Sequence, residues 1–194
     1  MVCMTTKLSD SSTSAEASGE VAIARAALRT PVGVIGVETS AAGLRRVGWR
    51  GDSAPYRVSG QNPASLLAGR ALDQLTAYFA GELTEFDLPL DLPELGESTR
   101  TVLMVLKETV GYGRTVTYGE LAARSGDSAL GDAAVPARAI GSIMGSNPVP
   151  IVIPCHRVVA SDGLGGYSGG EKGRGRETKT WLLEHEGALP PTLI

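Results

Sequence analysis

The sequence predicts an α+β fold in which a small strand-rich N-terminal domain precedes a mostly helical C-terminal domain. Two observations lead to this prediction. Residues 21–50 contain short apolar runs separated by turn signals, which is typical of strands in a small sheet. Residues 98–185 instead contain several segments with helical spacing. We therefore expect a tail at 1–20, an N-terminal domain with its connecting segment at 21–97, and a C-terminal domain at 98–194.

Composition and charge narrow the range of partners. The chain of 194 residues is 42% hydrophobic and 20% charged, which is ordinary for a soluble globular protein with a good core. The net charge is −3. The first 97 residues carry 8 Lys and Arg against 12 Asp and Glu, whereas the remaining residues carry 10 against 9. A polyanionic partner would therefore prefer the C-terminal half.

Residues that bind metals or form disulfides are scarce. The chain has two Cys and two His, and no Cys pair has zinc spacing, so we expect neither a disulfide framework nor a metal site. Residues 161–170 are Gly-rich but lack the strand–loop–helix context and the Lys of a phosphate loop, so we expect no nucleotide cofactor. The sequence shows no apolar run of membrane-spanning length and no signal-peptide pattern, which predicts a cytoplasmic protein without a membrane partner.

The N-terminal half contains both strand and helix signals. Residues 5–20 are Ser/Thr-rich and are expected to be disordered. The runs "VAIARAAL", "TPVGVIGVET" and "GLRRVGWRG" predict three strands. In "NPASLLAGRALDQLTAYFAGE" the apolar spacing predicts a helix with Asn62 as its cap, Pro63 at its first position and Gly81 at its end. The acidic, Pro-rich "FDLPLDLPELGES" predicts an extended connection.

Three helices are predicted after the connection. The first is capped by Ser98 or Thr99, the second begins near Thr117, and the third begins at Pro136 and is closed by "NP". The second and third raise the question of a helix-turn-helix, although the connection "GDSALGDAAV" is longer than the usual turn of about 3–4 residues.

The third helix has an unusual surface for a reader of DNA sequence. Recognition helices in the major groove normally present long polar side chains to base edges. Here Ala137, Ala139, Gly141 and Ser142 are small, and Arg138 is the single long polar side chain among them. Such a helix can lie close to a backbone or enter a narrow groove. The alternative is that its small residues allow tight packing in the core.

The stretch "NPVPIVIPCHRVV" carries reactive groups at the end of an apolar run. The run predicts a buried strand that Pro154 ends, presenting Cys155. A buried free cysteine is usually a small hydrophobe, but His156 and Arg157 favour the thiolate here. Neighbours on an extended chain point to opposite faces, so we expect Cys155 and His156 to couple through a water. Glu186 in "WLLEHEG" is the best candidate to orient the histidine.

These motifs resemble those of the O6-alkylguanine-DNA alkyltransferases, also called methylated-DNA–protein-cysteine methyltransferases. Over residues 98–194 the similarity includes "TYGELAA", "ARAIGSIMGSNPVPIVIPCHRVV", "GYSGG" and "WLLEHEG", in the order of the family. The N-terminal half matches more loosely through "TPVGVIGVETSAAGLRRV" and "AYFAGE". The resemblance implies a ribonuclease H-like N-terminal domain and a C-terminal domain with a winged-helix-like helix-turn-helix that binds DNA and accepts the alkyl group.

The resemblance also implies an activity. Members bind double-stranded DNA from the minor groove and flip the damaged base. They then move the alkyl group from O6 of guanine, and from O4 of thymine, irreversibly to a cysteine, which matches Cys155. His156 matches the base that acts through water, and Glu186 matches the carboxylate that orients it. The resemblance implies a single-turnover monomer without a cofactor, and leaves cooperative binding to DNA open. Some members carry a zinc in the N-terminal domain, for which this chain lacks the ligands.

Further residues match positions that bind the substrate. Arg138 matches the arginine that fills the vacated stack, and Tyr118 matches the tyrosine whose hydroxyl meets the flipped nucleotide. Asn147 matches the residue that braces the turn beside the active site, and Tyr167 and Ser168 match a pocket wall whose donors can stabilise the guanine oxygen. The small residues expected to face DNA are Ala137, Ala139 and Gly141.

The chain departs from the family pattern at three places. The segment "SALGDAAV" lengthens the loop between the two DNA-binding helices, and Pro136 stands where alanine is usual. The segment "EKGRGRE" adds Lys172, Arg174 and Arg176, which are either phosphate contacts or a solvated loop.

Two alternative functions differ in class from alkyl transfer. One is a non-catalytic lesion-binding module that recruits other repair. Non-reactive relatives replace the cysteine, whereas this chain keeps Cys155 with His156 and Glu186. The other is a cysteine hydrolase, in which the small-residue helix and Arg138 would have no role.

Overall fold

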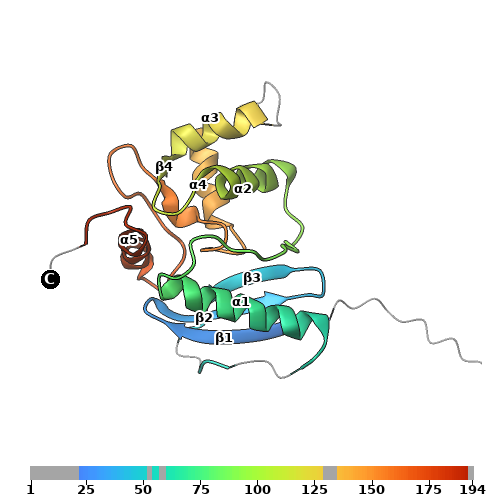
Figure 1. Ribbon diagram of the computed structural model, residues 1–194. Coiled ribbons are helices and arrows are strands. Elements are labelled where there is room, and N and C mark those ends of the chain that lie inside the picture. Colours follow the sequence, from blue (N-terminus) through green and yellow to red (C-terminus); the bar gives the residue numbers. More distant parts are fainter. Residues whose placement is uncertain (1–21, 52–53, 57–59, 129–134, 192–194) are drawn as a thin grey trace, which may run out of the picture.

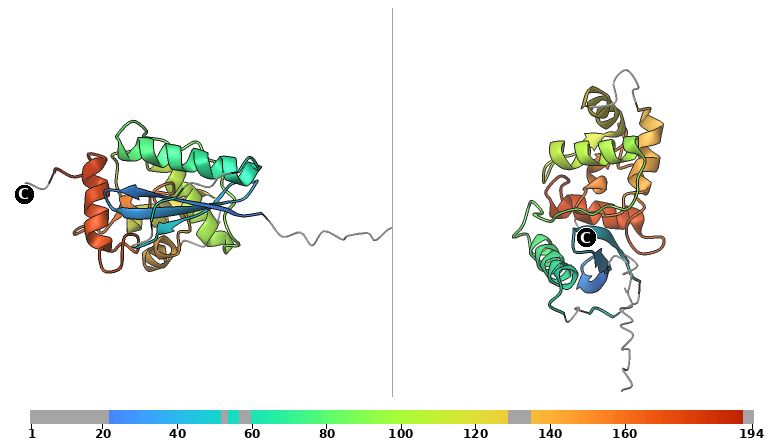
Figure 2. Two further views of the ribbon diagram at one scale, coloured as in Figure 1. Left: turned by 90° about the horizontal axis from the view of Figure 1, so that it is seen from below. Right: turned by 90° about the vertical axis from the view of Figure 1, so that its right-hand side faces the viewer.

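The computed structural model describes residues 22–51, 54–56, 60–128 and 135–191, which form two halves stacked on one another (Figures 1 and 2). The lower half in Figure 1 is a sheet covered by a helix, and the upper half is mostly helical. This arrangement confirms the predicted fold class. The expected tail at 1–20 lies outside the described residues.

The N-terminal half is a three-stranded antiparallel sheet in the order β1-β2-β3. Its strands are β1 (Ala24–Thr30), β2 (Gly33–Thr39) and β3 (Leu44–Trp49), which coincide with the three predicted apolar runs. The register pairs Leu28 with Ile35 and Val37 with Val47. Side chains of β1 alternate in burial over much of the strand because one face of the sheet is covered.

Helix α1 (Pro63–Phe79) covers that face of the sheet, as the view from below in Figure 2 shows. The predicted start is confirmed, because the Asn62 side chain accepts a hydrogen bond of 2.9 Å from the Ser65 amide and Pro63 stands at the first helical position. The buried side of α1 includes Leu72, Leu75 and Tyr78. Burial of this stripe attaches the helix to the sheet.

The segment after α1 is extended, as predicted, and runs beside β3. The Leu44 amide donates to Pro89 O at 2.8 Å, and the Asp91 amide donates to Leu44 O at 3.0 Å. A third backbone bond joins the two halves directly, because the Val47 amide of β3 donates to Pro148 O at 2.9 Å. These bonds occupy the free edge of β3 and place the sheet against the segment that leads to Cys155.

The described part of the C-terminal half contains four helices, a short parallel pair of strands and a 3₁₀ turn. Helices α2, α3 and α4 pack together, and α5 lies at the junction of the two halves (Figure 2). The elements are α2 (Glu97–Thr109), β4 (Val116–Thr117), α3 (Tyr118–Ser128), α4 (Ala137–Gly145), the 3₁₀ helix Cys155–Arg157, β5 (Val158–Val159) and α5 (Gly175–His185).

Two helix starts test the sequence predictions. The predicted cap of α2 is wrong, because the helix begins at Glu97 after Gly96 and has no side-chain cap, which places Ser98 inside the first turn. An acidic residue at that end is favourable to the helix dipole. The start of α3 near Thr117 is confirmed. Its Oγ1 accepts from the Glu120 amide at 3.2 Å, and Glu120 accepts from the Thr117 amide at 2.8 Å, which is a capping box.

Helices α3 and α4 pack against each other, as a helix-turn-helix requires. Residues 129–134 of their connection lie outside the described part of the chain. Pro136 is the N-cap of α4, so the helix proper begins at Ala137.

Candidate active site

The segment before Cys155 is a tight turn, and the prediction of a buried strand here is wrong. The Ile153 amide donates to Val149 O at 2.9 Å, and Ile151 adopts a φ of 76°. A β-branched residue rarely takes this left-handed conformation, so the turn must be held by its surroundings. The apolar side chains are buried as expected, but in a turn rather than a strand.

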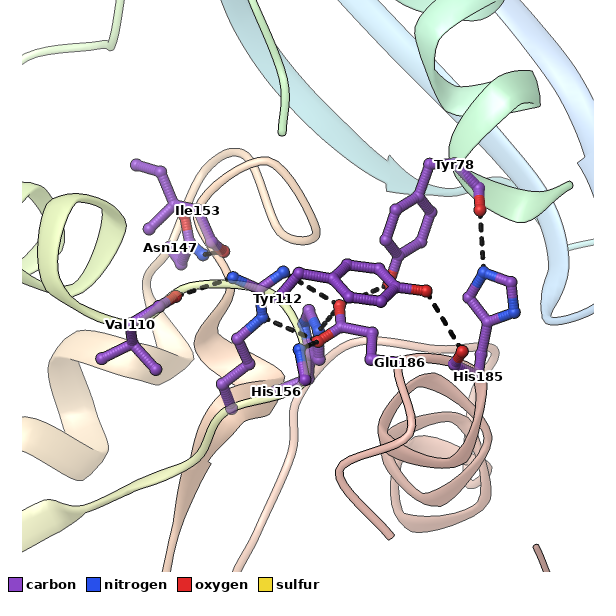
Figure 3. Close-up of polar contacts among 10 residues, drawn as sticks. Tyr78, Val110, Tyr112, Asn147, Ile153, His156, His185 and Glu186 are labelled. Atoms are coloured by element: carbon purple, nitrogen blue, oxygen red, sulfur yellow. Dashed lines mark hydrogen bonds and ion pairs between the residues drawn. The ribbon is translucent and has the colours of Figure 1, made fainter. Parts of the chain in front are cut away.

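The side chain of Asn147 stabilises this turn through two hydrogen bonds. Its Nδ2 donates to Ile153 O at 2.8 Å, and its Oδ1 accepts from the Val149 amide at 3.1 Å (Figure 3). The predicted bracing contact is therefore present. Pro154 follows as the N-cap of the 3₁₀ helix, so Cys155 and His156 occupy consecutive positions of a helical turn rather than opposite faces of a strand.

Cys155 lies at the wall of a cavity of about 360 Å³, a volume in the range of small-molecule sites. Three of the predicted pocket residues, Tyr118, Tyr167 and Ser168, line the same cavity. So does Gly141 of α4, which places the small-residue helix beside the thiol. The remaining lining residues are Met144, Gly145 and Gly166.

The pocket wall requires a glycine at one position. Gly165 has a φ of 70°, and a Cβ there would lie 3.1 Å from the ring of Tyr118 and 3.2 Å from the Ala160 amide nitrogen. A side chain would therefore be strained and would push against the tyrosine. The Gly-rich segment thus allows the loop to approach Tyr118, which is the close-approach role that such a loop can have.

The thiol of Cys155 is protonated at rest, contrary to the expectation that its neighbours lower its pKa. Cys155 is 4% exposed, and burial raises its pKa to about 11, while interactions with Asn147 and with the charge of Lys179 act in the opposite direction. Arg157 does not contribute, since its guanidinium pairs elsewhere. A reaction at this sulfur therefore needs a base to take the proton.

The two residues after Cys155 belong to a buried charge network centred on Glu186, which follows α5 as its C-cap. The His156 Nε2 is 2.8 Å from Glu186 Oε1 (Figure 3). Arg157 Nε donates to Oε2 at 2.8 Å. Arg157 also donates to Oε1 at 3.1 Å and to Val110 O at 2.7 Å. The structure therefore brings the predicted histidine and carboxylate together.

The electrostatics of the pair suit a neutral base held by an ionised carboxylate. Burial lowers the pKa of His156, although the hydrogen bond and charge of Glu186 oppose this shift. Burial alone would raise the pKa of Glu186. The hydrogen bonds of His156 and Arg157, the charge of Arg157 and, once the histidine is protonated in acid, the charge of the imidazolium prevail and lower it to about 2. The other ring nitrogen, His156 Nδ1, is buried and has no hydrogen-bond partner among the described residues.

Three residues of this site were not predicted from the sequence. Arg157 donates to the carboxylate of Glu186 and not to the thiol. Tyr78 of α1 donates to Glu186 Oε1 at 2.7 Å. Lys179 of α5 donates to Val158 O at 2.6 Å and to Gly166 O at 3.0 Å. Lys179 is fully buried, and burial lowers its pKa to about 8. Its ammonium ties the pocket loop to β5. A lysine between two threonines of a helix gives no sequence signal of such a role.

The exposure of α4 shows whether its small residues serve packing in the core. Gly141, Ser142 and Arg138 are exposed, and a Cβ at Gly141 would meet no atom within 4 Å. Packing in the core therefore does not explain Gly141 or Ser142. Ala139 is half-buried, and Ala137 begins the helix.

The added segment after Gly170 is largely exposed to solvent. Arg174 pairs with Glu177 at 2.7 Å, while Lys172 and Arg176 are exposed.

The described residues show neither a metal site nor a membrane-spanning helix. They contain no group of three or more His, Cys, Asp and Glu side chains that could hold a metal ion. Within the same residues, no helix is long and apolar enough to cross a membrane.

Comparison with known proteins shows which family this chain belongs to. A family model described as "6-O-methylguanine DNA methyltransferase, DNA binding domain" matches residues 97–188, and its "ribonuclease-like domain" counterpart matches 23–92. The "Methylated-DNA--protein-cysteine methyltransferase" of Homo sapiens is 38% identical over 176 residues, covering 84% of this chain and 80% of that protein. The chain belongs to this alkyltransferase family.

Other relatives of the family differ in how much they cover. The protein of the same name from Mycobacterium tuberculosis is 48% identical over 122 residues, which are 62% of this chain and 66% of that protein's length. A crystal structure of M. tuberculosis OGT in complex with DNA matches with a TM-score of 0.64 at 35% identity, covering 84% of this chain and 92% of that one. A Thermus thermophilus relative named "DNA base-flipping protein" is 39% identical over 164 residues, covering 84% of this chain and 99% of that protein.

Proposed function

We propose that this alkyltransferase repairs DNA by moving the alkyl group of O6-alkylguanine, and of O4-alkylthymine, to Cys155 in a single irreversible step. The observation that carries the proposal is the placement of the thiol. Cys155 lies at a cavity bordered by the exposed small-residue face of α4 on one side, and the next residue in the chain, His156, forms a buried pair with Glu186. A flipped nucleotide base can enter such a cavity. The buried His156–Glu186 pair can then accept the proton of the Cys155 thiol.

The chemistry is an in-line displacement at the alkyl carbon. The bond between Sγ of Cys155 and the alkyl carbon forms as the bond between that carbon and the guanine O6 breaks. The thiol proton passes to His156 Nδ1 through a bridging water, which suits the unpaired state of that buried nitrogen. Glu186 stabilises the resulting imidazolium. The proton then leaves for the restored guanine, so that the protein keeps a thioether and the charges of the network are unchanged.

Developing charge on the guanine oxygen is met by neutral donors of the pocket wall. Burial raises the pKa of Tyr118 and raises that of Tyr167 well above its ordinary value, so both hydroxyls keep their protons. Ser168 completes this wall. Donors fixed in a pocket stabilise a leaving oxyanion without reorganising during the reaction.

The face of α4 is proposed to lie in the minor groove. Gly141 and Ser142 are exposed and small, so a DNA backbone or base edge can approach the helix closely. Arg138, also exposed, fills the stack that the flipped base leaves. Flipping costs a few kcal/mol and is easiest for a base that pairs poorly, as an alkylated guanine does.

The test is incubation with a duplex that contains one O6-methylguanine, followed by intact mass measurement of the protein. We expect a gain of one methyl group per molecule, located on Cys155, with no second turnover. The Cys155→Ala variant should bind the duplex but gain nothing. Restored guanine without methylated protein would contradict the proposal.

A second candidate is lesion binding without transfer, because one relative is named a base-flipping protein. In that case the protein would bind methylguanine duplex more tightly than an unmodified duplex, and both the DNA and the protein would stay unchanged in mass. The same incubation therefore separates the two functions. The presence of Cys155 in the cavity favours transfer.

A further inference from the structure

The carboxylate of Glu186 receives a hydrogen bond from the N-terminal half of the chain. The hydroxyl of Tyr78, in the last turn of α1, donates to Glu186 Oε1 at 2.7 Å across 108 positions of sequence (Figure 3). The same oxygen lies 2.8 Å from His156 Nε2. Tyr78 and the histidine base therefore share one acceptor atom.

Tyr78 is held rigidly where it makes this bond. Its side chain is completely buried, and its ring packs edge-on against Phe79 and Tyr112 with centroids 5.2 and 6.2 Å apart. The backbone oxygen of Tyr78 is 2.7 Å from Nε2 of His185, which is the residue next to Glu186 in the chain. The donor is thus fixed from both ends, by the core of one half and by the last turn of α5. Burial, reinforced by the charge of Glu186, raises the pKa of Tyr78 far above its ordinary value, so the hydroxyl remains a donor.

The shared oxygen gives Tyr78 two effects on the base. A carboxylate on a flexible side chain can rotate, and a fixed donor on Oε1 restricts the rotation that would turn this oxygen away from His156. The same bond withdraws negative charge from Oε1, which lowers the proton affinity of the histidine it holds. Arg157 makes its shorter bond, of 2.8 Å, to Oε2 and only a longer one, of 3.1 Å, to Oε1, so the Tyr78 hydroxyl is the closer of these two donors to the oxygen that holds His156.

We propose that Tyr78 is a positioning residue for the His156–Glu186 pair, so that the N-terminal half takes a direct part in alkyl transfer rather than serving as a scaffold. The inference rests on the proposed function for its effect on rate. It also makes a claim about the histidine alone, namely that its proton affinity depends on a hydroxyl in the other half of the chain.

The test compares Tyr78→Phe with Tyr112→Phe. Each variant removes one hydroxyl from the same aromatic cluster, buried in Tyr78 and part-buried in Tyr112, but the Tyr112 hydroxyl donates to the backbone oxygen of His185 at 3.1 Å and not to the carboxylate. For Tyr78→Phe we expect transfer to Cys155 to slow about 10-fold, equally for methylguanine duplex and for free O6-benzylguanine, as loss of a bond to a charged group implies. Tyr112→Phe should react within about two-fold of the unmodified protein.

The pH profile distinguishes positioning from simple support of the fold. Without the Tyr78 hydroxyl, Glu186 holds the imidazolium more strongly, so the pKa of His156 rises and the acid limb of the rate profile moves to higher pH. Nitrogen-15 NMR of His156 should show the same upward shift in the absence of any substrate. Replacing Tyr78 by 2,3-difluorotyrosine, which keeps the ring and strengthens the donor, should shift it downward and serves if the phenylalanine variant does not fold.

The outcomes are separable. Unchanged rate, profile and histidine titration in Tyr78→Phe would overturn the inference, as would loss of thermal stability alone. If the unmodified protein takes up no alkyl group, the proposed function fails instead. The NMR titration then still decides whether Tyr78 acts on the pair.

Discussion

The buried network at Glu186 and the exposed face of α4 are built on opposite principles. At Glu186 both carboxylate oxygens are occupied, by His156, Arg157 and Tyr78, and the groups come from both halves of the chain. On α4 the face next to the cavity is exposed and carries small residues and one arginine. The first region holds charge in fixed positions where water cannot screen it. The second leaves room for a large partner to come close. The difference indicates that reactivity and DNA contact can be altered separately.

The largest effect is expected at the centre of the network. Glu186→Gln leaves the buried guanidinium of Arg157 without its counter-charge, and we expect a loss of about 3–5 kcal/mol in the free energy of unfolding. The imidazolium also loses its stabilising charge, so transfer should slow by at least about 100-fold. Urea denaturation and single-turnover kinetics measure the two losses. The matched control is Glu184→Gln on the same helix, where the side chain is half-buried. Equal effects at both positions would mean that the network has no special role.

The next effect is confined to the DNA-facing region. Arg138→Ala should slow repair of duplex about 10-fold, because the vacated stack is no longer filled. Reaction with free O6-benzylguanine should not change, since no duplex has to be opened. Arg25→Ala, which removes an exposed arginine of the N-terminal sheet, controls for the loss of one positive charge. A parallel loss on both substrates would assign Arg138 to the chemistry instead.

Acid should weaken the network and leave α4 unaffected. The pKa of His156 is lowered by burial, so the folded state resists its protonation and stability falls as pH drops below about 6.5. The pKa of Glu186 is lowered to about 2, so its contribution is complete above pH 4.5 and is lost as pH falls from there toward 2. This second step amounts to about 3 kcal/mol. Urea midpoints between pH 7 and pH 2 should trace both steps, and a flat profile would show that the buried charges are not coupled to folding.

The smallest effect tests why α4 carries glycine. Gly141→Ala should raise the free energy of unfolding by about 0.5–1 kcal/mol, since the site is helical, exposed and free of neighbours. The added methyl group borders the cavity, so duplex repair should fall a few-fold. Denaturation and repair kinetics on the same preparation compare the two. A variant that is more stable and equally active would show that close approach to DNA does not require the glycine.

Patterns among neighbouring residues in the sequence predicted most helices and strands. They did not predict contacts between residues that lie far apart in the sequence. Asn62 and Pro63 identify the start of α1 because capping depends on adjacent residues alone. The turn containing Ile151 was missed because its apolar residues are buried as they would be in a strand, and burial does not determine φ. The state of the thiol was also missed, since adjacent charges suggested a lowered pKa whereas burial raises it. The bond between Tyr78 and Glu186 joins positions that no sequence spacing connects.

The separation of the two regions is tested most directly by a double-mutant cycle on duplex repair. Second-order rate constants for transfer to Cys155 would be measured for Arg138→Ala, for Glu186→Asp, which keeps the charge but shortens its reach, and for the double variant. Exposed Arg138 and buried Glu186 lie on different helices, so the two losses should add as free energies within about 0.5 kcal/mol. A coupling of more than about 1 kcal/mol would contradict the account, because DNA contact and proton transfer would then act as one unit.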